Sequence, residues 1–208
     1  MATETIEHAV VNLLTANGYL RDSELLEKLE LVKDDFNAGH ISLPTIFRSL
    51  NANLRRFSME IKSIHLTNSN NDRITYHGLV NTEEDFVSKE FGAPFDAAEL
   101  KYFTVIVGKL LEVNFLSTAD ILGLWNIDKT KKEQAQSFIS KLESLGYLRR
   151  NDANYLILGV KSHLELRFYL ESVIQNTVDL DALDDAQREE KAAQIKALLD
   201  DMPQIIVY

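Results

Sequence analysis

A short pattern occurs twice in this chain, and it restricts the possible folds more than any other feature. Near Leu13 and again near Leu110, an apolar helical stretch ends, an aromatic–leucine pair follows, and a second helical stretch begins. The pairs are Tyr19-Leu20 in the first copy and Phe115-Leu116 in the second, which is one residue shorter. A recurring supersecondary pattern at this spacing predicts a duplicated domain.

Each copy opens a longer pattern of three helices followed by two strands. In the first half, apolar periodicity predicts helices over about residues 3–17, 22–33 and 42–57, and alternation around a turn-rich segment predicts a hairpin. The second half repeats this plan, with Gly146 ending its third helix, a hairpin over residues 147–158 and a closing helix over about 162–175. Three helices with such a wing are typical of a winged helix.

We therefore predict a mainly α protein with small β-wings, built from tandem winged-helix domains and an acidic tail. The first domain spans residues 1–82, the second spans residues 83–176, and the helical tail spans residues 177–208. The last thirty residues carry three basic and eight acidic side chains, so the tail should dock weakly or on a partner. No Gly-, Ser- or Pro-rich linker occurs, so the two domains should pack together.

The residues that usually carry chemistry are missing or badly spaced. The chain has no cysteine, which excludes disulfides, thiol nucleophiles and thiolate zinc sites. The eight glycines never form a phosphate-binding loop, and the five histidines lack the spacing of a helical metal pair. We predict no catalytic residue, no metal, no cofactor and no small-molecule substrate. The sequence also shows no secretion signal and no membrane span, so we expect an intracellular protein.

The charge pattern disfavours tight, autonomous DNA binding, because the formal net charge is −10. The most basic stretch surrounds the third helix of the second domain, the element that reads the major groove in helix-turn-helix proteins. It consists of Lys129, Lys131, Lys132, Lys141, Arg149 and Arg150. These residues form either a phosphate-contacting patch or a solvated face flanked by acids.

The helix expected over residues 96–113 has more apolar surface than one small core requires. Phe103 and Val107 belong to one apolar stripe, whereas a second stripe lies on another side, and the closing helix has a similar surplus. Packing between the two domains could cover the surplus, and the alternative is a partner surface. The predicted partner-binding residues are Tyr102, Ile106, Val113, Leu166, Leu170 and Val173.

Several fragments resemble the non-SMC element 1 subunits of the structural-maintenance-of-chromosomes five/six complex. Their order and spacing agree with the tandem winged-helix frame over about residues 1–175. The fragments are Glu60-Ile61-Lys62, Tyr76-His77-Gly78-Leu79-Val80-Asn81-Thr82, Asp96-Ala97-Ala98-Glu99-Leu100, Ser117-Thr118-Ala119-Asp120-Ile121-Leu122-Gly123-Leu124 and Lys131-Lys132-Glu133.

This resemblance implies a nuclear protein that binds a MAGE-type winged-helix partner and a kleisin subunit, in a complex that serves DNA repair and recombination. The family normally carries a zinc-binding RING domain that supports ubiquitin ligation. A chain without cysteine cannot supply its ligands, so the domain was lost or truncated, and we predict a RING-less, non-catalytic architectural subunit. The alternative is a winged-helix transcription regulator that binds DNA autonomously.

Overall fold

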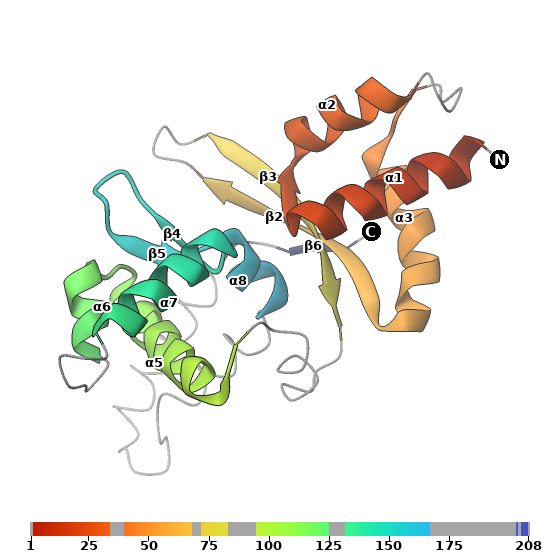
Figure 1. Ribbon diagram of the computed structural model, residues 1–208. Helices are drawn as coiled ribbons and strands as arrows, with labels where there is room; N and C mark the ends of the chain where they lie inside the picture. The colour runs from red at the N-terminus through yellow and green to blue at the C-terminus, as the bar shows by residue number, and fades with distance from the viewer. Residues whose placement is uncertain are drawn as a thin grey trace, which may run out of the picture. The chain divides into compact units, whose positions relative to one another are not determined.

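The chain divides into two units (Figure 1). The first contains residues 1–92 and 204–208, and the second contains residues 93–203. The structure is a computed structural model that describes residues 2–33, 40–67, 72–82, 95–124, 132–166, 203 and 205–207. The residues directly after the predicted boundary at residue 82 lie outside these ranges. Most of the predicted acidic tail, residues 177–208, also lies outside them.

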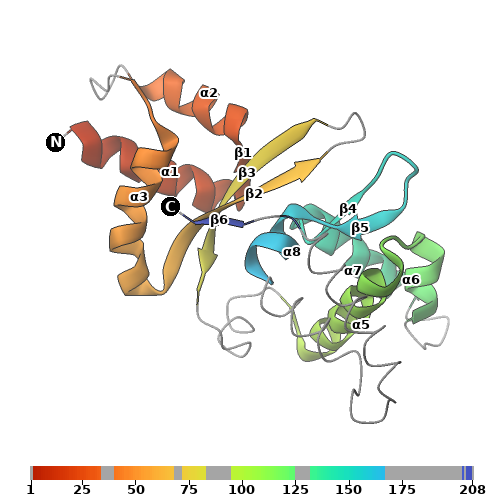
Figure 2. The same ribbon diagram turned by 180° about the vertical axis from the view of Figure 1, so that it is seen from behind.

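The first unit has three helices followed by a hairpin, an order compatible with a winged helix. Its elements are α1 (Ala2–Asn17), β1 (Tyr19–Arg21), α2 (Asp22–Val32), α3 (Leu43–Leu54), the 3-10 turn η2 (Arg55–Phe57), β2 (Met59–Thr67), β3 (Arg73–Asn81) and β6 (Ile205–Val207). The strands form one antiparallel sheet in the order β1-β3-β2-β6, shown from behind in Figure 2. The helix predicted to reach residue 57 instead tightens into η2 and ends at Ser58, which has a left-handed φ of 54°.

The core of the first unit lies between its helices and the sheet. Fully buried apolar side chains come from α1, α2, α3 and β2, and they include Leu14, Leu25, Phe47 and Ile61. Buried Asn51 of α3 accepts a hydrogen bond from the backbone N–H of Ile61 at 2.7 Å and donates one to its carbonyl at 3.0 Å. This side chain therefore satisfies both polar groups of a strand residue and fixes α3 on β2.

A second buried polar contact joins α2 to the hairpin. His77 of β3 is 1% exposed, its Nε2 lies 2.9 Å from a carboxylate oxygen of Asp22, and its Nδ1 lies 2.6 Å from Ser63 Oγ. Because a carboxylate only accepts, Nε2 carries the proton and Nδ1 accepts from the serine hydroxyl. Burial lowers the pKa of His77, and the nearby Asp22 only partly offsets that effect, so the ring is neutral at pH 7.

The C-terminal strand corrects the predicted domain division. Residues 205–207, which the sequence placed in the acidic tail, pair with residues 62–64 of β2 and extend the sheet of the first unit. Ile205, Ile206 and Val207 are β-branched, and such residues favour extended backbone. The helix predicted from about Leu183 to Asp201 lies outside the described residues.

The second unit repeats the order of the first. Its elements are α5 (Ala97–Val113), α6 (Thr118–Leu124), α7 (Lys132–Ser144), β4 (Leu148–Arg150), β5 (Leu156–Leu158) and α8 (Val160–Glu165). Between α5 and α6, Leu116 forms a single antiparallel bridge with Leu156 of β5, just as Leu20 of β1 pairs with β3 in the first unit. The residue that ends the first helix is left-handed in both copies, with a φ of 73° at Gly18 and 64° at Asn114.

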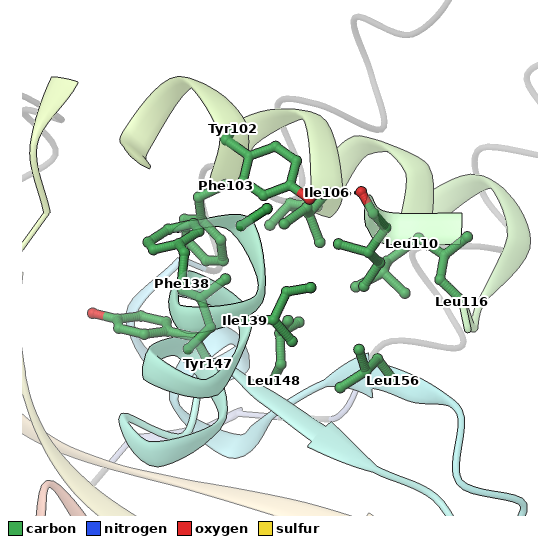
Figure 3. Packing of buried hydrophobic residues seen from close by; sticks show 14 of the residues in the cluster. Tyr102, Phe103, Ile106, Leu110, Leu116, Phe138, Ile139, Tyr147, Leu148 and Leu156 are labelled. Carbon is green, nitrogen blue, oxygen red and sulfur yellow. Dashed lines mark hydrogen bonds between the residues drawn. The ribbon is translucent and has the colours of Figure 1, made fainter. Parts of the chain in front are cut away.

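Aromatic rings form one end of the second core (Figure 3). The ring centroid of Tyr147 lies 5.3 Å from that of Phe103 and 5.6 Å from that of Phe95, which in turn lies 5.5 Å from that of Phe138. Aliphatic residues of α5, α7 and the hairpin fill the remainder, including Ile139 and Leu156. Tilted and edge-on rings at these distances pack favourably, so these aromatic side chains contribute to the stability of the second core.

The start of α8 is held against the end of α7 by a close backbone approach. Gly146 ends α7 with a left-handed φ of 80°, as the sequence predicts. The N–H of Gly159 donates to the carbonyl of Tyr147 at 2.7 Å. A Cβ atom at Gly159 would lie 2.2 Å from the carbonyl oxygen of Gly146, so this position excludes any side chain.

We predict that Gly159→Ala lowers the free energy of unfolding by about 1–3 kcal/mol, because the added methyl group forces two backbone segments apart. The matched control is Gly108→Ala in α5, where a Cβ meets nothing within 4 Å and helix propensity favours alanine by up to about 1 kcal/mol. Urea unfolding followed by circular dichroism measures both. Equal stability of the two variants would contradict the close approach.

We also predict a pH dependence that originates at His77. Since its folded pKa lies below the unfolded value of about 6.5, the unfolded chain binds the proton more tightly, and stability falls as the pH drops below that value. His77→Gln should reduce stability at pH 7 by about 1–3 kcal/mol and flatten the decline between pH 7 and pH 5. Urea midpoints at several pH values test this, with exposed His8→Gln as control. An unchanged slope in His77→Gln excludes His77 as the source.

Candidate interaction surface

The structure buries three of the four described residues that the sequence placed on spare apolar stripes of the helices expected over residues 96–113 and 162–175. Tyr102 is 6% exposed, Ile106 is fully buried and Leu166 is 8% exposed, and all three belong to the core of the second unit. The expectation of a free surface at these residues is therefore wrong. Val113 is exposed, and Leu170 and Val173 lie outside the described residues.

Most of both apolar stripes of α5 is covered, because side chains from each stripe pack in the core of the second unit. On one side, the Tyr102 hydroxyl donates to the carbonyl of Ile121 in α6 at 2.6 Å, and burial raises the pKa of this tyrosine to about 12. The ring centroid of Tyr102 also lies 5.8 Å from that of Phe138 in α7, and Phe103 of the other stripe packs against Tyr147. An aspartate at either stripe would place a charge in the core rather than block a partner.

The second unit still exposes apolar side chains, at different positions. Val105 and Val113 of α5 are 44% and 39% exposed, and beyond the end of α5 Phe115 and Tyr155 are 50% and 39% exposed. The rings of Phe115 and Tyr155 lie 4.9 Å apart. In the sequence, Phe115 belongs to the repeated aromatic–leucine pair and Tyr155 to the second hairpin, and neither position predicts an exposed ring.

One residue of the predicted basic patch, Lys141, has a partner inside its own unit. Lys141 Nζ lies 2.7 Å from a carboxylate oxygen of Glu99 and 5.1 Å from the centre of the Phe95 ring. Lys129, Lys131 and the side chain of Lys132 lie outside the described residues. Arg149 on β4 is exposed and available. Lys141 is thus occupied within its own unit, which weakens the expectation of a phosphate-contacting face.

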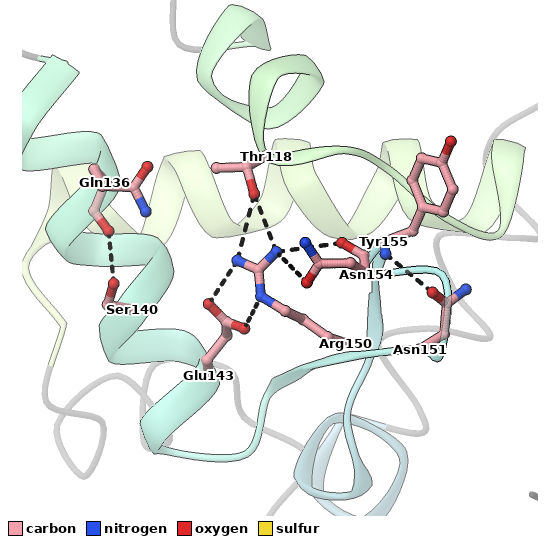
Figure 4. A network of polar contacts seen from close by, with 8 residues as sticks. All are labelled: Thr118, Gln136, Ser140, Glu143, Arg150, Asn151, Asn154 and Tyr155. Atoms are coloured by element: carbon pink, nitrogen blue, oxygen red, sulfur yellow. Dashed lines mark hydrogen bonds and ion pairs between the residues drawn. The ribbon is translucent and has the colours of Figure 1, made fainter.

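Arg150 is the centre of a polar network at the base of the wing (Figure 4). Its guanidinium donates to both carboxylate oxygens of Glu143 in α7, at 2.8 and 3.1 Å. It also donates to the Thr118 hydroxyl of α6 and to the carbonyl of Asn154, each at 3.3 Å. Arg150 therefore joins α6, α7 and the hairpin, whereas the sequence left it either in a phosphate-contacting patch or on a solvated face.

The described residues contain no obvious reactive centre. No group of three or more histidines, aspartates and glutamates in this part of the chain is placed to hold a metal ion. The Ser63, His77 and Asp22 contact has the residue types of a nucleophilic triad, but Ser63 is fully buried and cannot meet a substrate. None of the described helices is long and apolar enough to cross a bilayer.

The fold has a solved counterpart. A chain of a structure titled "Nse1-Nse3-Nse4 complex" superposes with a TM-score of 0.68 and 19% sequence identity, over 82% of this chain and 75% of that one. No protein-family profile and no curated protein matches the sequence. At 19% identity this likeness establishes a shared fold, and it does not by itself establish a function.

The two neighbouring arginines of β4 give a matched test of the polar network. Arg150→Gln should lower the free energy of unfolding by about 1–2 kcal/mol, because it removes a two-point contact with Glu143 and leaves that partly buried carboxylate unpaired. Arg149→Gln changes an exposed side chain and should shift stability by less than about 0.5 kcal/mol. Thermal unfolding compares them, and equal melting temperatures would refute the structural role.

Proposed function

We propose that this chain is a non-catalytic, Nse-type subunit that acts by binding other proteins in a structural-maintenance-of-chromosomes assembly. The single observation that carries the proposal is the superposition, over 82% of the chain, on a chain of the Nse1-Nse3-Nse4 complex. The fragments resembling non-SMC element 1 subunits support the same assignment independently, since they come from the sequence alone. We further propose that the partners are a MAGE-type winged-helix subunit and a kleisin, and that the protein works in the nucleus in DNA repair.

A role in binding agrees with the chemistry of the chain. The sequence has no cysteine, so a RING-type zinc site cannot form from these residues, and ubiquitin ligation is not part of the proposal. The buried serine–histidine–aspartate contact serves the fold of the first unit rather than a reaction. Several large apolar side chains of the second unit are exposed, and such side chains are typical of protein contacts.

The partner surface that we propose is the outer face of α5. Val105 and Val113 are exposed there, at positions where the core needs no side chain. The residues that face inward, Tyr102 and Ile106, act by holding α5 in place. Burying the exposed valines against a partner would contribute roughly 25 cal/mol per Å² before the entropy cost of association.

Contact with DNA is a weaker candidate for this chain on its own. Lys141 and Arg150 have carboxylate partners inside the second unit, and the net charge of −10 opposes an approach to phosphates. Exposed Arg149 could add a contact within a larger assembly. An autonomous regulator predicts duplex binding at low salt that is lost in Arg149→Glu, and absence of any duplex binding would exclude that alternative.

The proposal is tested by affinity purification of the full chain from the nuclei of cells that produce it. We expect mass spectrometry to recover SMC-type ATPases and a kleisin. The double change Val105→Asp and Val113→Asp should reduce their recovery at least about tenfold, because two desolvated charges cost several kcal/mol at an interface. Gln136→Asp, at an exposed position of α7 outside the proposed surface, is the control.

Two outcomes contradict different parts of the proposal. If the wild-type chain recovers no SMC-type ATPase and no kleisin, the proposed assembly is wrong. If both are recovered and the double variant retains them, the assembly stands and the partner surface lies elsewhere. Circular dichroism of each variant should match the wild type, because the substituted side chains are exposed.

A further inference from the structure

The duplication extends to a pair of aromatic rings at the same place in each unit. In the first unit, Tyr19 of β1 and Tyr76 of β3 have ring centroids 6.0 Å apart. In the second unit, Phe115 and Tyr155 occupy the corresponding places, because each precedes the bridged leucine or its partner by one residue. The two copies therefore contain equivalent ring pairs beside the step between their first two helices.

In the first unit an arginine of the same chain lies over one ring of this pair. The guanidinium carbon of Arg21 lies 5.8 Å from the centre of the Tyr76 ring, and its Nε lies 4.0 Å from a carboxylate oxygen of Glu24. Glu24 also accepts a hydrogen bond from the backbone N–H of Arg21 at 3.0 Å. The guanidinium thus has a ring on one side and a carboxylate at the edge, both of which favour its charge.

The second unit has the ring pair and the carboxylate but not the cation. Ser117 occupies the position of Arg21, directly after the bridged leucine, and Asp120 occupies the position of Glu24. The backbone N–H of Ser117 donates to an Asp120 carboxylate oxygen at 3.0 Å, which reproduces the contact of the first unit. Within the described part of the chain, no cation lies over Phe115 or Tyr155, and both rings are exposed.

We propose that Phe115, Tyr155 and Asp120 form a binding site for an arginine side chain of another protein. The arginine would take the place that Arg21 fills in the first unit. A planar guanidinium stacks on rings and is weakly hydrated, so it suits this site better than an ammonium group does. A nucleobase could also stack on the rings, but Asp120 repels the phosphates that accompany it. The site is independent of which assembly the chain joins.

The direct test is an NMR titration of the full chain with N-acetyl-arginine amide. We expect saturable shifts of the Phe115 and Tyr155 ring signals with an affinity on the order of 10 mM, and weaker shifts with N-acetyl-lysine amide. Asp120→Asn should weaken binding by roughly 2- to 5-fold, since it removes one exposed charge contact. Larger shifts with adenosine than with arginine would overturn the proposal in favour of a nucleobase.

Two reciprocal variants make the test specific. Ser117→Arg supplies the guanidinium from the chain itself, as in the first unit, and should abolish the arginine-induced shifts. Arg21→Ser removes the internal guanidinium and should create new shifts at Tyr19 and Tyr76, while serine still suits the start of α2. No saturable shift in the wild type, or shifts that persist unchanged in Ser117→Arg, would overturn the proposal.

Discussion

The backbone pairing between the step after the first helix and the last strand of the hairpin holds each unit together. In the second unit it is one reciprocal pair of hydrogen bonds, from Leu116 to Leu156 at 3.0 Å and back at 2.8 Å. In the first unit it extends to three residues of β1. This pairing joins the step after the first helix to the last hairpin strand, so the three helices and the hairpin of each unit pack together. Both bridged leucines, Leu20 and Leu116, are buried.

The same topology is secured by different polar contacts in the two copies. Where the first unit has His77 opposite Leu20, the second has the apolar Leu156 opposite Leu116. The second unit instead relies on Arg150 at the wing and on Tyr147, whose hydroxyl donates to Glu165 at 2.7 Å. Such divergence leaves an arginine over Tyr76 in one copy, whereas the rings of Phe115 and Tyr155 are exposed in the other.

The repeat and the helix–hairpin order could be predicted from sequence because they depend on local patterns. The left-handed helix end at Gly146 and the capping side chain of Asp96 are both readable within a few residues. The burial of Tyr102 and Ile106 could not be predicted from the sequence, since apolar spacing shows which sides of a helix are apolar but not how many of them are covered. The pairings of Lys141 with Glu99 and of residues 205–207 with β2 join distant segments, and no local pattern encodes them.

The central claim is that α5 is held by its inner side chains and presents its outer side to partner proteins. Cross-linking mass spectrometry of the natively purified chain tests it most directly, because Lys101 and Lys109 lie on that helix and reach solvent. The prediction is cross-links from these lysines to a kleisin or a winged-helix subunit. A native chain that is monomeric, or whose lysines cross-link only within the chain, would contradict the claim.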